Sequence, residues 1–397
     1  MRRHMQRMRK SVRSRLPLSR FRTKAPPHII RYFQPVYPLE FSGLKIGQIL
    51  TGEKWDYQLV EKLDKKFLYA ETFKAKVQPK GESLEYPEWA IVKAGNQGVG
   101  TSVRAFSREY NAYHLSTVAS NGLFRSMYDL LSDPRALDAD DEEWDPSDED
   151  LPQCLAFEWL DYTLADVPPN RVRNDYFIWN IMNTILQSAV ALNTSNYVNT
   201  YIEPRSLLLS DAASSTPVMK VADLHGVYKE GDILFPAPTL TKFSCLRAPE
   251  QFLGHPCVRS CTVWSLAAMI FQILKPEAFT LPPELRGIAF LIECEPRMIA
   301  YFMKLFPHWK FSIGPGNNVH DKDTYRWRFE DAEMFARTPD ILPFSIQIEK
   351  MNISRELRNI LSMMLIPDVQ SRPSAADVLR SNEYRIFSES IHRPIYA

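Results

Sequence analysis

Five cysteines are the residues of this chain best suited to metal or redox chemistry. They are Cys154, Cys245, Cys257, Cys261 and Cys294. They are odd in number and scattered, and no two of them form the C-x-x-C pair found in zinc sites and redox motifs. We therefore expect neither a zinc centre nor a disulfide framework, and we interpret the cysteines as structural thiols of a reducing compartment.

A glycine-rich segment, Gly95-Asn96-Gln97-Gly98-Val99-Gly100, raises phosphate binding as a second kind of chemistry. Backbone amides in such segments can contact phosphate groups when a helix follows. Here the order is G-x-x-G-x-G, no Lys-Ser or Lys-Thr ends the segment as in a P-loop, and the flanking pattern is not βαβ. We interpret the segment as a loop that joins a strand to the next helix.

Alternating polar and apolar residues predict a β-rich N-terminal region. The expected strands are Leu44–Leu50, Tyr57–Leu63, Phe73–Val77, Glu88–Lys93, Ser126–Leu131 and Gln153–Glu158. One helix, Ser102–Leu115, interrupts this series and carries apolar residues on one face. Strands of this half-buried kind favour an antiparallel sheet.

The C-terminal region is mostly helical in pattern. Ile178–Ala189 follows the stripe of a buried helix, and Val258–Leu274 is apolar all round, as expected of a central helix. Leu357–Leu365 predicts another amphipathic helix, and Ser374 with Asp377 resembles a capping box. We therefore expect an α+β protein, with an antiparallel sheet and one helix followed by a larger, mainly helical part.

Composition and charge limit the class of protein. The 397 residues are 45% hydrophobic and 12% aromatic, which is enough for a sizeable core. The formal charge of +1 gives no global field that would recruit nucleic acid or a membrane surface. No apolar run approaches the roughly 20 residues of a membrane helix, so a soluble protein is expected.

Two segments concentrate charge. Residues 1–39 hold eleven Arg or Lys and no Asp or Glu, a composition that resembles a mitochondrial transit peptide. The alternatives are a disordered basic leader and a nuclear-import or RNA-contacting patch. Residues 138–150 hold nine acidic residues and are expected to form a solvated loop or insertion.

The stretch Val198–Ser210 gives the strongest indication of function in the sequence. It resembles the catalytic loop of eukaryotic protein kinases, and more narrowly that of fungal kinases similar to SR-protein kinases. In that loop an Asp accepts the proton of the substrate hydroxyl and an Asn holds a second magnesium ion. Here Tyr201 stands at the Asp position and Ser206 at the Asn position. Asn199 replaces the His, and Glu203 replaces a Lys that steadies the phosphate.

Further parts of the kinase pattern follow in the expected order. Ala90-Ile91-Val92-Lys93 matches the strand that presents the ATP-contacting Lys, and Glu109 matches the Glu that pairs with it. Glu158 and Leu160 lie in a segment that resembles the hinge beside adenine. Asp223 matches the metal-binding Asp of the D-F-G segment. The resemblance implies that these residues could still hold ATP and Mg²⁺.

The phosphate-binding and magnesium-binding loops depart from the pattern. His225 replaces the Gly of D-F-G, so we expect a strained backbone at His225 and a distorted loop. Leu63–Ala70 replaces the glycine-rich loop, with Asp64 at its first Gly position. Lys65 and Lys66 either supply charge to a phosphate or belong to a plain strand-to-strand turn.

Structural parts of the pattern are retained. Arg247-Ala248-Pro249-Glu250 resembles the A-P-E element, and the resemblance implies a buried ion pair between Glu250 and Arg372. In the kinase pattern an Asp at the position of Thr262 holds the catalytic loop in place. Its replacement by Thr is consistent with a loop that has lost its catalytic role.

The resemblance implies a bilobal kinase-like domain in which catalysis is impaired. The expected boundaries are 44–158 for an N-lobe, 161–385 for a C-lobe and 386–397 for a tail. We expect a pseudokinase that acts as a binding or regulatory module with a protein partner; the alternative is a weak or atypical Ser/Thr protein kinase. An intracellular location is expected, mitochondrial if the leader is a transit peptide and cytoplasmic or nuclear otherwise.

Overall fold

The structure, a computed structural model, describes most of the chain between residues 43 and 392. The described residues are 43–63, 70–81, 85–95, 100–131, 154–210, 217–234, 244–279, 288–316, 319–336 and 341–392. The basic leader, the acidic segment 138–150, Asp64, Lys65 and Lys66 lie outside these ranges, so the predictions made for them stay predictions.

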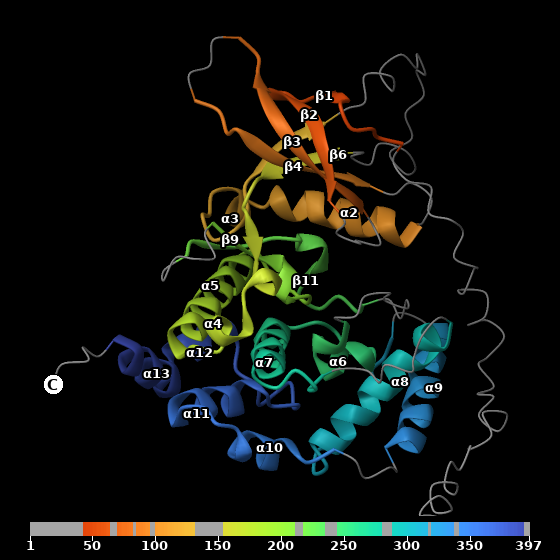
Figure 1. Cartoon of the computed structure of the whole chain (residues 1–397). Helices are drawn as coiled ribbons and strands as arrows, with labels where there is room; N and C mark the ends of the chain where they lie inside the picture. The colour runs from red at the N-terminus through yellow and green to blue at the C-terminus, as the bar shows by residue number, and fades with distance from the viewer. Residues whose placement is uncertain are drawn as a thin grey trace, which may run out of the picture. The chain divides into compact units, whose positions relative to one another are not determined.

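Six strands form one antiparallel sheet in the order β1-β2-β3-β4-β6-β5 (Figure 1). They are β1 (Ile49–Thr51), β2 (Trp55–Leu63), β3 (Ala70–Pro79), β4 (Trp89–Gly95), β5 (Met127–Leu131) and β6 (Cys154–Glu158). The register places Lys93 of β4 opposite Thr72 of β3 and Leu155 of β6. The strands predicted by alternation are therefore present, with shifted ends.

The predicted start of the first strand, at Leu44, is wrong. β1 begins at Ile49 because the preceding residues form a turn, in which the Gln48 N–H donates to the Lys45 carbonyl at 3.1 Å. Gly47 adopts a φ of +88°, a conformation that glycine tolerates and other residues rarely adopt. Strand geometry is therefore possible only after this turn.

The sheet curls so that β2 approaches β5. The Tyr57 hydroxyl of β2 donates to Asp129 Oδ2 of β5 at 2.5 Å, and the Lys54 N–H donates to Asp129 Oδ1 at 3.2 Å. The two faces of the sheet pack into different cores. Val92 and Ala94 belong to a small core within the curl, whereas Ile91 and Phe157 pack against the helical part.

The rest of the described chain is mainly helical, as predicted. The helices are α2 (Gly100–Tyr113), α3 (Ser116–Ala119), α4 (Pro169–Val172), α5 (Asp175–Thr194), α6 (Pro249–Phe252), α7 (Ser260–Leu274), α8 (Ile288–Leu305), α9 (Val319–Phe335), α10 (Phe344–Lys350), α11 (Arg355–Met364), α12 (Ala375–Arg380) and α13 (Asn382–His392). Short strands among them are β7 (Tyr162–Thr163), β8 (Tyr197–Asn199), β9 (Leu207–Leu209), β10 (Met219–Val221) and β11 (Val227–Lys229). The described residues also form four 3₁₀ turns, η3 (Leu164–Asp166), η4 (Pro204–Ser206), η5 (Leu224–Gly226) and η6 (Ser244–Leu246).

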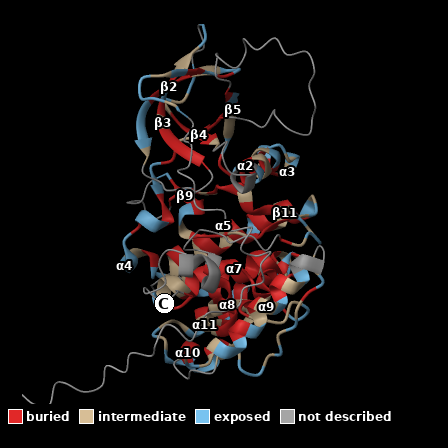
Figure 2. Cartoon of the chain, turned by 90° about the vertical axis from the view of Figure 1, so that its right-hand side faces the viewer, coloured by how far each residue is buried: buried red, intermediate tan, exposed pale blue. Residues whose placement is uncertain are grey.

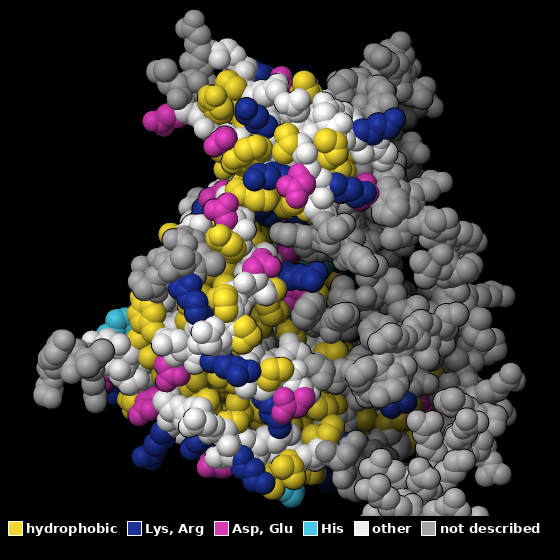
Figure 3. Space-filling model, in the orientation of Figure 1, with side chains coloured by type: hydrophobic (Ala, Val, Ile, Leu, Met, Phe, Trp, Pro, Cys, Tyr) yellow, Lys and Arg dark blue, Asp and Glu magenta, His cyan; other side chains and the backbone are white. Residues whose placement is uncertain are grey.

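Helices α5 and α7 lie at the centre of the large core (Figure 2). Every residue of α7 from Ser260 to Phe271 is buried, which agrees with its uniformly apolar sequence. The predicted capping box of α12 is present, because Ser374 Oγ accepts the Asp377 N–H and the Asp377 carboxylate accepts the Ser374 N–H. On the face shown in Figure 3 acidic and basic side chains are interspersed. No helix within the described ranges has the length and apolarity needed to cross a membrane.

Candidate functional site

Lys93 lies in a closed, buried ion-pair cluster. Strand β4 places Lys93 on the face turned toward α2, and its Nζ lies 2.6 Å from Glu109 Oε1. The same Nζ donates to Asp223 Oδ1, from the segment between β10 and η5. The predicted Lys93–Glu109 pair is therefore confirmed. The direct bond to Asp223 was not predicted, although sequence reasoning had singled out both residues.

Arg125 is the fourth charged group of the cluster, and sequence reasoning missed it. Arg125 lies in the segment of the chain that joins α3 to β5, and it is buried. Its Nε donates to the Glu158 carbonyl at 2.7 Å. The Phe157 ring lies 5.4 Å from Lys93 Nζ and 5.5 Å from the Arg125 guanidinium, so both cations face one aromatic side chain. No local pattern marks Arg125, because an Arg just before a strand is usually exposed.

The pKa shifts follow from this burial and charge. Burial alone would lower the pKa of Lys93, but the carboxylates of Asp223 and Glu109 outweigh burial and raise it. Burial raises the pKa of Glu109. Burial would also raise the pKa of Asp223, but its contact with Lys93 lowers it. Lys93 and Asp223 therefore stabilise each other's charged forms, and the four groups are neutral as a set.

The backbone strain predicted at His225 lies instead at Asp223. Asp223 adopts φ 57° and ψ 54°, in the left-handed region, whereas His225 lies within the 3₁₀ turn η5 and does not have a positive φ. Asp is among the residues that tolerate this region best, so the turn forms without a glycine at position 225. The His225 carbonyl accepts from Arg108 Nε at 3.0 Å, and burial lowers the pKa of its ring to about 3. Its imidazole is therefore neutral at physiological pH.

Tyr201 and Glu203 fill the centre of the predicted catalytic loop. The Tyr201 hydroxyl donates to Glu203 Oε2 at 3.0 Å, and its ring centroid lies 4.8 Å from that of His225. A Cβ atom on Gly226 would approach Tyr201 Cβ to 2.3 Å, so only glycine fits beside this tyrosine. Glu203 is buried, and its burial raises the pKa to about 7.

Asn199 and Ser206 are committed to hydrogen bonds within the loop. Asn199 Oδ1 accepts the Tyr201 N–H at 3.0 Å, and Ser206 Oγ donates to the Glu203 carbonyl at 2.8 Å. Thr262 Oγ1 donates to the Asn199 carbonyl at 2.7 Å. Thr262 thus still fastens the loop to α7, although it replaces an acidic residue of the kinase pattern.

The predicted hinge residues lie at the end of β6, with Glu158 as its last residue and Leu160 two residues later. Both carboxylate oxygens of Glu158 accept from Lys220 Nζ at 2.7 Å. Leu160 packs with Leu208 and Ala222 in a small apolar cluster. Because Ala222 directly precedes Asp223, this cluster joins the predicted hinge to the Lys93 site.

Glu250 and Arg372 form the predicted buried ion pair. Arg372 Nη1 lies 2.7 Å from Glu250 Oε1, and Nη2 lies 2.9 Å from Oε2, so the contact is bidentate. The guanidinium also lies 4.9 Å from the centroid of a Trp264 ring. This pair connects α6 with the segment before α12 and is a structural element.

The described residues offer a divalent cation few ligands. Mg²⁺ requires several oxygen ligands in near-octahedral geometry. Within the described ranges no group of three or more His, Cys, Asp or Glu side chains could hold a metal ion. Asp223 Oδ1 already accepts from Lys93, and the Ser206 hydroxyl donates to a carbonyl. Mg²⁺ bound with a nucleotide takes one or two carboxylates and completes its shell with phosphates and water, so Asp223 is the candidate ligand, with its Oδ1 already engaged by Lys93.

Comparison with known proteins assigns no family. No protein-family model matches the chain, and a search of curated proteins finds no match. A function must therefore be inferred from the residues of this site.

Proposed function

We propose that this chain is a bilobal, protein-kinase-like pseudokinase, similar in pattern to fungal kinases of the SR-protein type, and that it works as a binding or regulatory module. The curled sheet with α2, followed by the mainly helical part, is compatible with that two-lobe fold. The ordered sequence matches at Lys93, Glu109, Asp223, Glu250 and Arg372 support the same proposal.

The observation that carries the loss of catalysis is the Tyr201–Glu203 hydrogen bond. Phosphoryl transfer to a hydroxyl needs a group that accepts its proton and metal ions that neutralise phosphate charge. Tyr201 stands where the accepting Asp would be, and its hydroxyl is a donor to Glu203. A phenol with an ordinary pKa of about 10 is not a base near neutral pH. The loss of a general base alone costs about 10²–10⁴ in rate.

The contacts within the Lys93 cluster indicate that a nucleotide binds weakly at best. Glu109 pairs with Lys93 as in a kinase that binds ATP, so the weakening comes from the direct bond between Asp223 and Lys93, with which a phosphate group would compete. Glu203, when ionised, would add another negative charge near that position. We therefore expect that ATP with Mg²⁺ binds weakly or not at all.

Two assays on the full-length protein test this proposal. In a thermal unfolding assay, ~1 mM ATP with Mg²⁺ should raise the midpoint by no more than about 1 °C, because weak binding adds well under 1 kcal/mol. In a phosphotransfer assay with basic, Ser-rich substrates, the wild type should show no more turnover than Asp223→Ala. Turnover that Asp223→Ala abolishes would refute the pseudokinase proposal.

One observation favours the second candidate, a weak Ser/Thr protein kinase. The Glu203 carboxyl, with a pKa of about 7, has the proton affinity of a general base that works at neutral pH. If it accepts the substrate proton directly or through the Tyr201 hydroxyl, turnover should rise with pH through about 7 and disappear in Glu203→Gln. A flat pH profile at background level in both proteins would exclude this candidate.

A further inference from the structure

Lys74, on strand β3, holds its ammonium between two tryptophan rings. Its Nζ lies 4.3 Å from the centroid of a Trp89 ring and 4.5 Å from that of a Trp159 ring. The Trp159 indole is oriented by Nε1, which donates to Asp161 Oδ1 at 2.9 Å. In the part of the chain that the structure describes, the Lys74 side chain forms no ion pair or hydrogen bond, and the two tryptophans make no ring contact with each other. The ammonium is therefore held by the faces of two indole rings.

This Lys74 stack, which consists of Lys74, Trp89 and Trp159, lies on the same face of the sheet as Lys93. Trp89, Ile91 and Lys93 alternate along β4, so their side chains point to one face. Lys74 is paired with Ile91 in the register of β3 and β4, which places Lys74 on that face as well. Trp89 and Lys93 lie roughly 13 Å apart along the strand. The Lys74 stack and the Lys93 cluster are therefore two ends of one surface.

An apolar cluster connects these two ends. Leu160 directly follows Trp159 and packs with Leu208 and Ala222. Ala222 directly precedes Asp223, the partner of Lys93. The surface thus offers two aromatic faces, then an apolar wall, then a cation. A nucleotide carries a planar base at one end and phosphates at the other, so a nucleotide is the ligand class that fits this order.

We propose that Lys74 makes an autoinhibitory contact: it occupies the position of a nucleobase between Trp89 and Trp159, and a base must displace it. The inference rests on the kinase-like site proposed above and adds a second cause of weak nucleotide binding, besides the bond between Asp223 and Lys93. Indole faces attract planar bases as well as cations, so the base and the ammonium compete for the same two rings.

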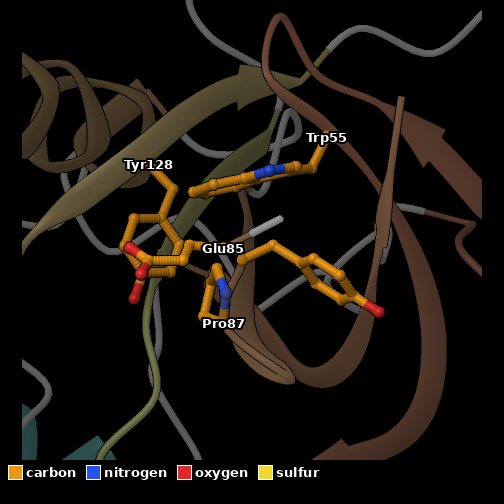
Figure 4. Close-up of a pocket in the computed structure, with 5 residues that line it drawn as sticks. Trp55, Glu85, Pro87 and Tyr128 are labelled. Atoms are coloured by element: carbon orange, nitrogen blue, oxygen red, sulfur yellow. The ribbon is translucent and has the colours of Figure 1, made fainter. Parts of the chain in front are cut away.

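The described structure offers no such aromatic slot in the pocket on the opposite face of the sheet (Figure 4). That pocket has a volume of about 510 Å³ and is lined by Trp55, Glu85, Tyr86, Pro87 and Tyr128. The rings of Trp55 and Tyr128 meet edge to face, with centroids 5.3 Å apart. Trp89 and Trp159 are instead separated by a cation, so removal of Lys74 frees two ring faces.

Equilibrium dialysis of the full-length protein against radiolabelled adenosine tests the autoinhibitory contact. Adenosine carries the base without phosphates, so its binding does not require Lys93 to leave Asp223. Lys74→Thr should bind adenosine about tenfold more tightly than the wild type, because the ammonium no longer competes for two rings. Thr is favoured in strands, so this variant should fold. Lys76→Thr, at an exposed position of the same strand and face, is the matched control and should bind like the wild type.

Two further variants locate the effect. Lys74→Arg should bind adenosine like the wild type, because a guanidinium also lies favourably on aromatic faces. The double variant Lys74→Thr/Trp89→Ala should lose about tenfold relative to Lys74→Thr, because one stacking face is removed. If a thermal unfolding assay shows that this double variant does not fold, Lys74→Thr/Trp159→Leu takes its place.

Equal adenosine binding by the wild type and Lys74→Thr would overturn the proposal, and so would absence of saturable binding in both. A gain that persists after loss of the tryptophan would place adenosine elsewhere and overturn it too. If Lys74→Thr binds tetramethylammonium more tightly than adenosine, the choice of a nucleobase is wrong.

These outcomes are separate from the proposed loss of catalysis. Turnover in the phosphotransfer assay would refute the pseudokinase proposal, whereas adenosine dialysis would still report on Lys74. Equal adenosine binding would overturn the autoinhibitory contact and leave the phosphotransfer result unaffected.

Discussion

Replacing Lys93 by Met should strongly destabilise the fold, because Lys93 is the shared partner of two buried carboxylates. The Lys93 side chain is 2% exposed, and those of Glu109 and Asp223 are 0% and 5% exposed. Without the ammonium, two carboxylates would remain with Arg125 as the nearby cation. Removing one member of a buried ion pair costs roughly 3–5 kcal/mol, since a charge is left uncompensated. We expect a loss in the free energy of unfolding of that size.

Urea unfolding of the full-length chain would measure this loss. Lys76→Met is the matched control, because Lys76 is an exposed Lys on the neighbouring strand β3 and its replacement should cost no more than about 0.5 kcal/mol. The double variant Lys93→Met/Glu109→Gln removes one of the two carboxylates left without a partner. It should therefore lose less stability than the sum of the single variants, with an interaction energy of about 0.5–3 kcal/mol.

The pH dependence supplies a second check. In the wild type the raised pKa of Lys93 adds stability that is lost only as pH rises through that pKa, above 10.5, so Lys93 gives no slope near neutral pH. In Lys93→Met, burial would raise the carboxyl pKa values of Glu109 and Asp223. A raised carboxyl pKa costs stability above that pKa and is relieved as pH falls, so the loss should shrink between about pH 8 and about pH 5. An unchanged stability at both pH values would show that Lys93 does not hold the cluster together, and it would leave Lys93 available for a phosphate.

Three further predictions concern the rest of the site. Glu250→Ala or Arg372→Ala should each cost roughly 3–5 kcal/mol in urea unfolding, because each leaves a buried charge alone; an unchanged midpoint would contradict the bidentate pair. The wild type should lose stability as pH rises from 4.5 through about 7, because the pKa of Glu203 is raised to about 7, and Glu203→Gln should remove this slope, up to roughly 3 kcal/mol. Gly226→Ala should destabilise by about 1–3 kcal/mol, because its Cβ would lie 2.3 Å from Tyr201 Cβ, and wild-type stability would show that this contact can relax at no cost.

Local sequence patterns were sufficient for the elements but not for their ends. Alternation predicted the strands of the sheet, because one face of each packs into a core. Alternation placed the start of the first strand too early, at Leu44. A two-residue period of polar and apolar residues does not indicate a turn that needs Gly47 at positive φ. The uniformly apolar α7 and the capping box of α12 were predictable because their signals are local.

Contacts between distant residues were predictable only where a known pattern ordered them. The order of motifs along the chain predicted the pairs of Lys93 with Glu109 and of Glu250 with Arg372. Nothing local predicted Arg125 in the cluster. The contact between the Tyr201 and His225 rings also could not be predicted, because it depends on how two loops meet.

The charge balance of the Lys93 cluster lets it stabilise the fold without a bound nucleotide. A site that holds phosphates must present excess positive charge, either its own or that of a bound metal ion, whereas Lys93, Arg125, Glu109 and Asp223 are neutral as a set. A neutral, hydrogen-bonded cluster stabilises the junction of β4, α2 and the Asp223 turn without any ligand. Glu203, which becomes anionic above about pH 7, moves the local charge further from what a phosphate needs. The contribution of Lys93, Glu109 and Asp223 to folding therefore requires neither a ligand nor turnover.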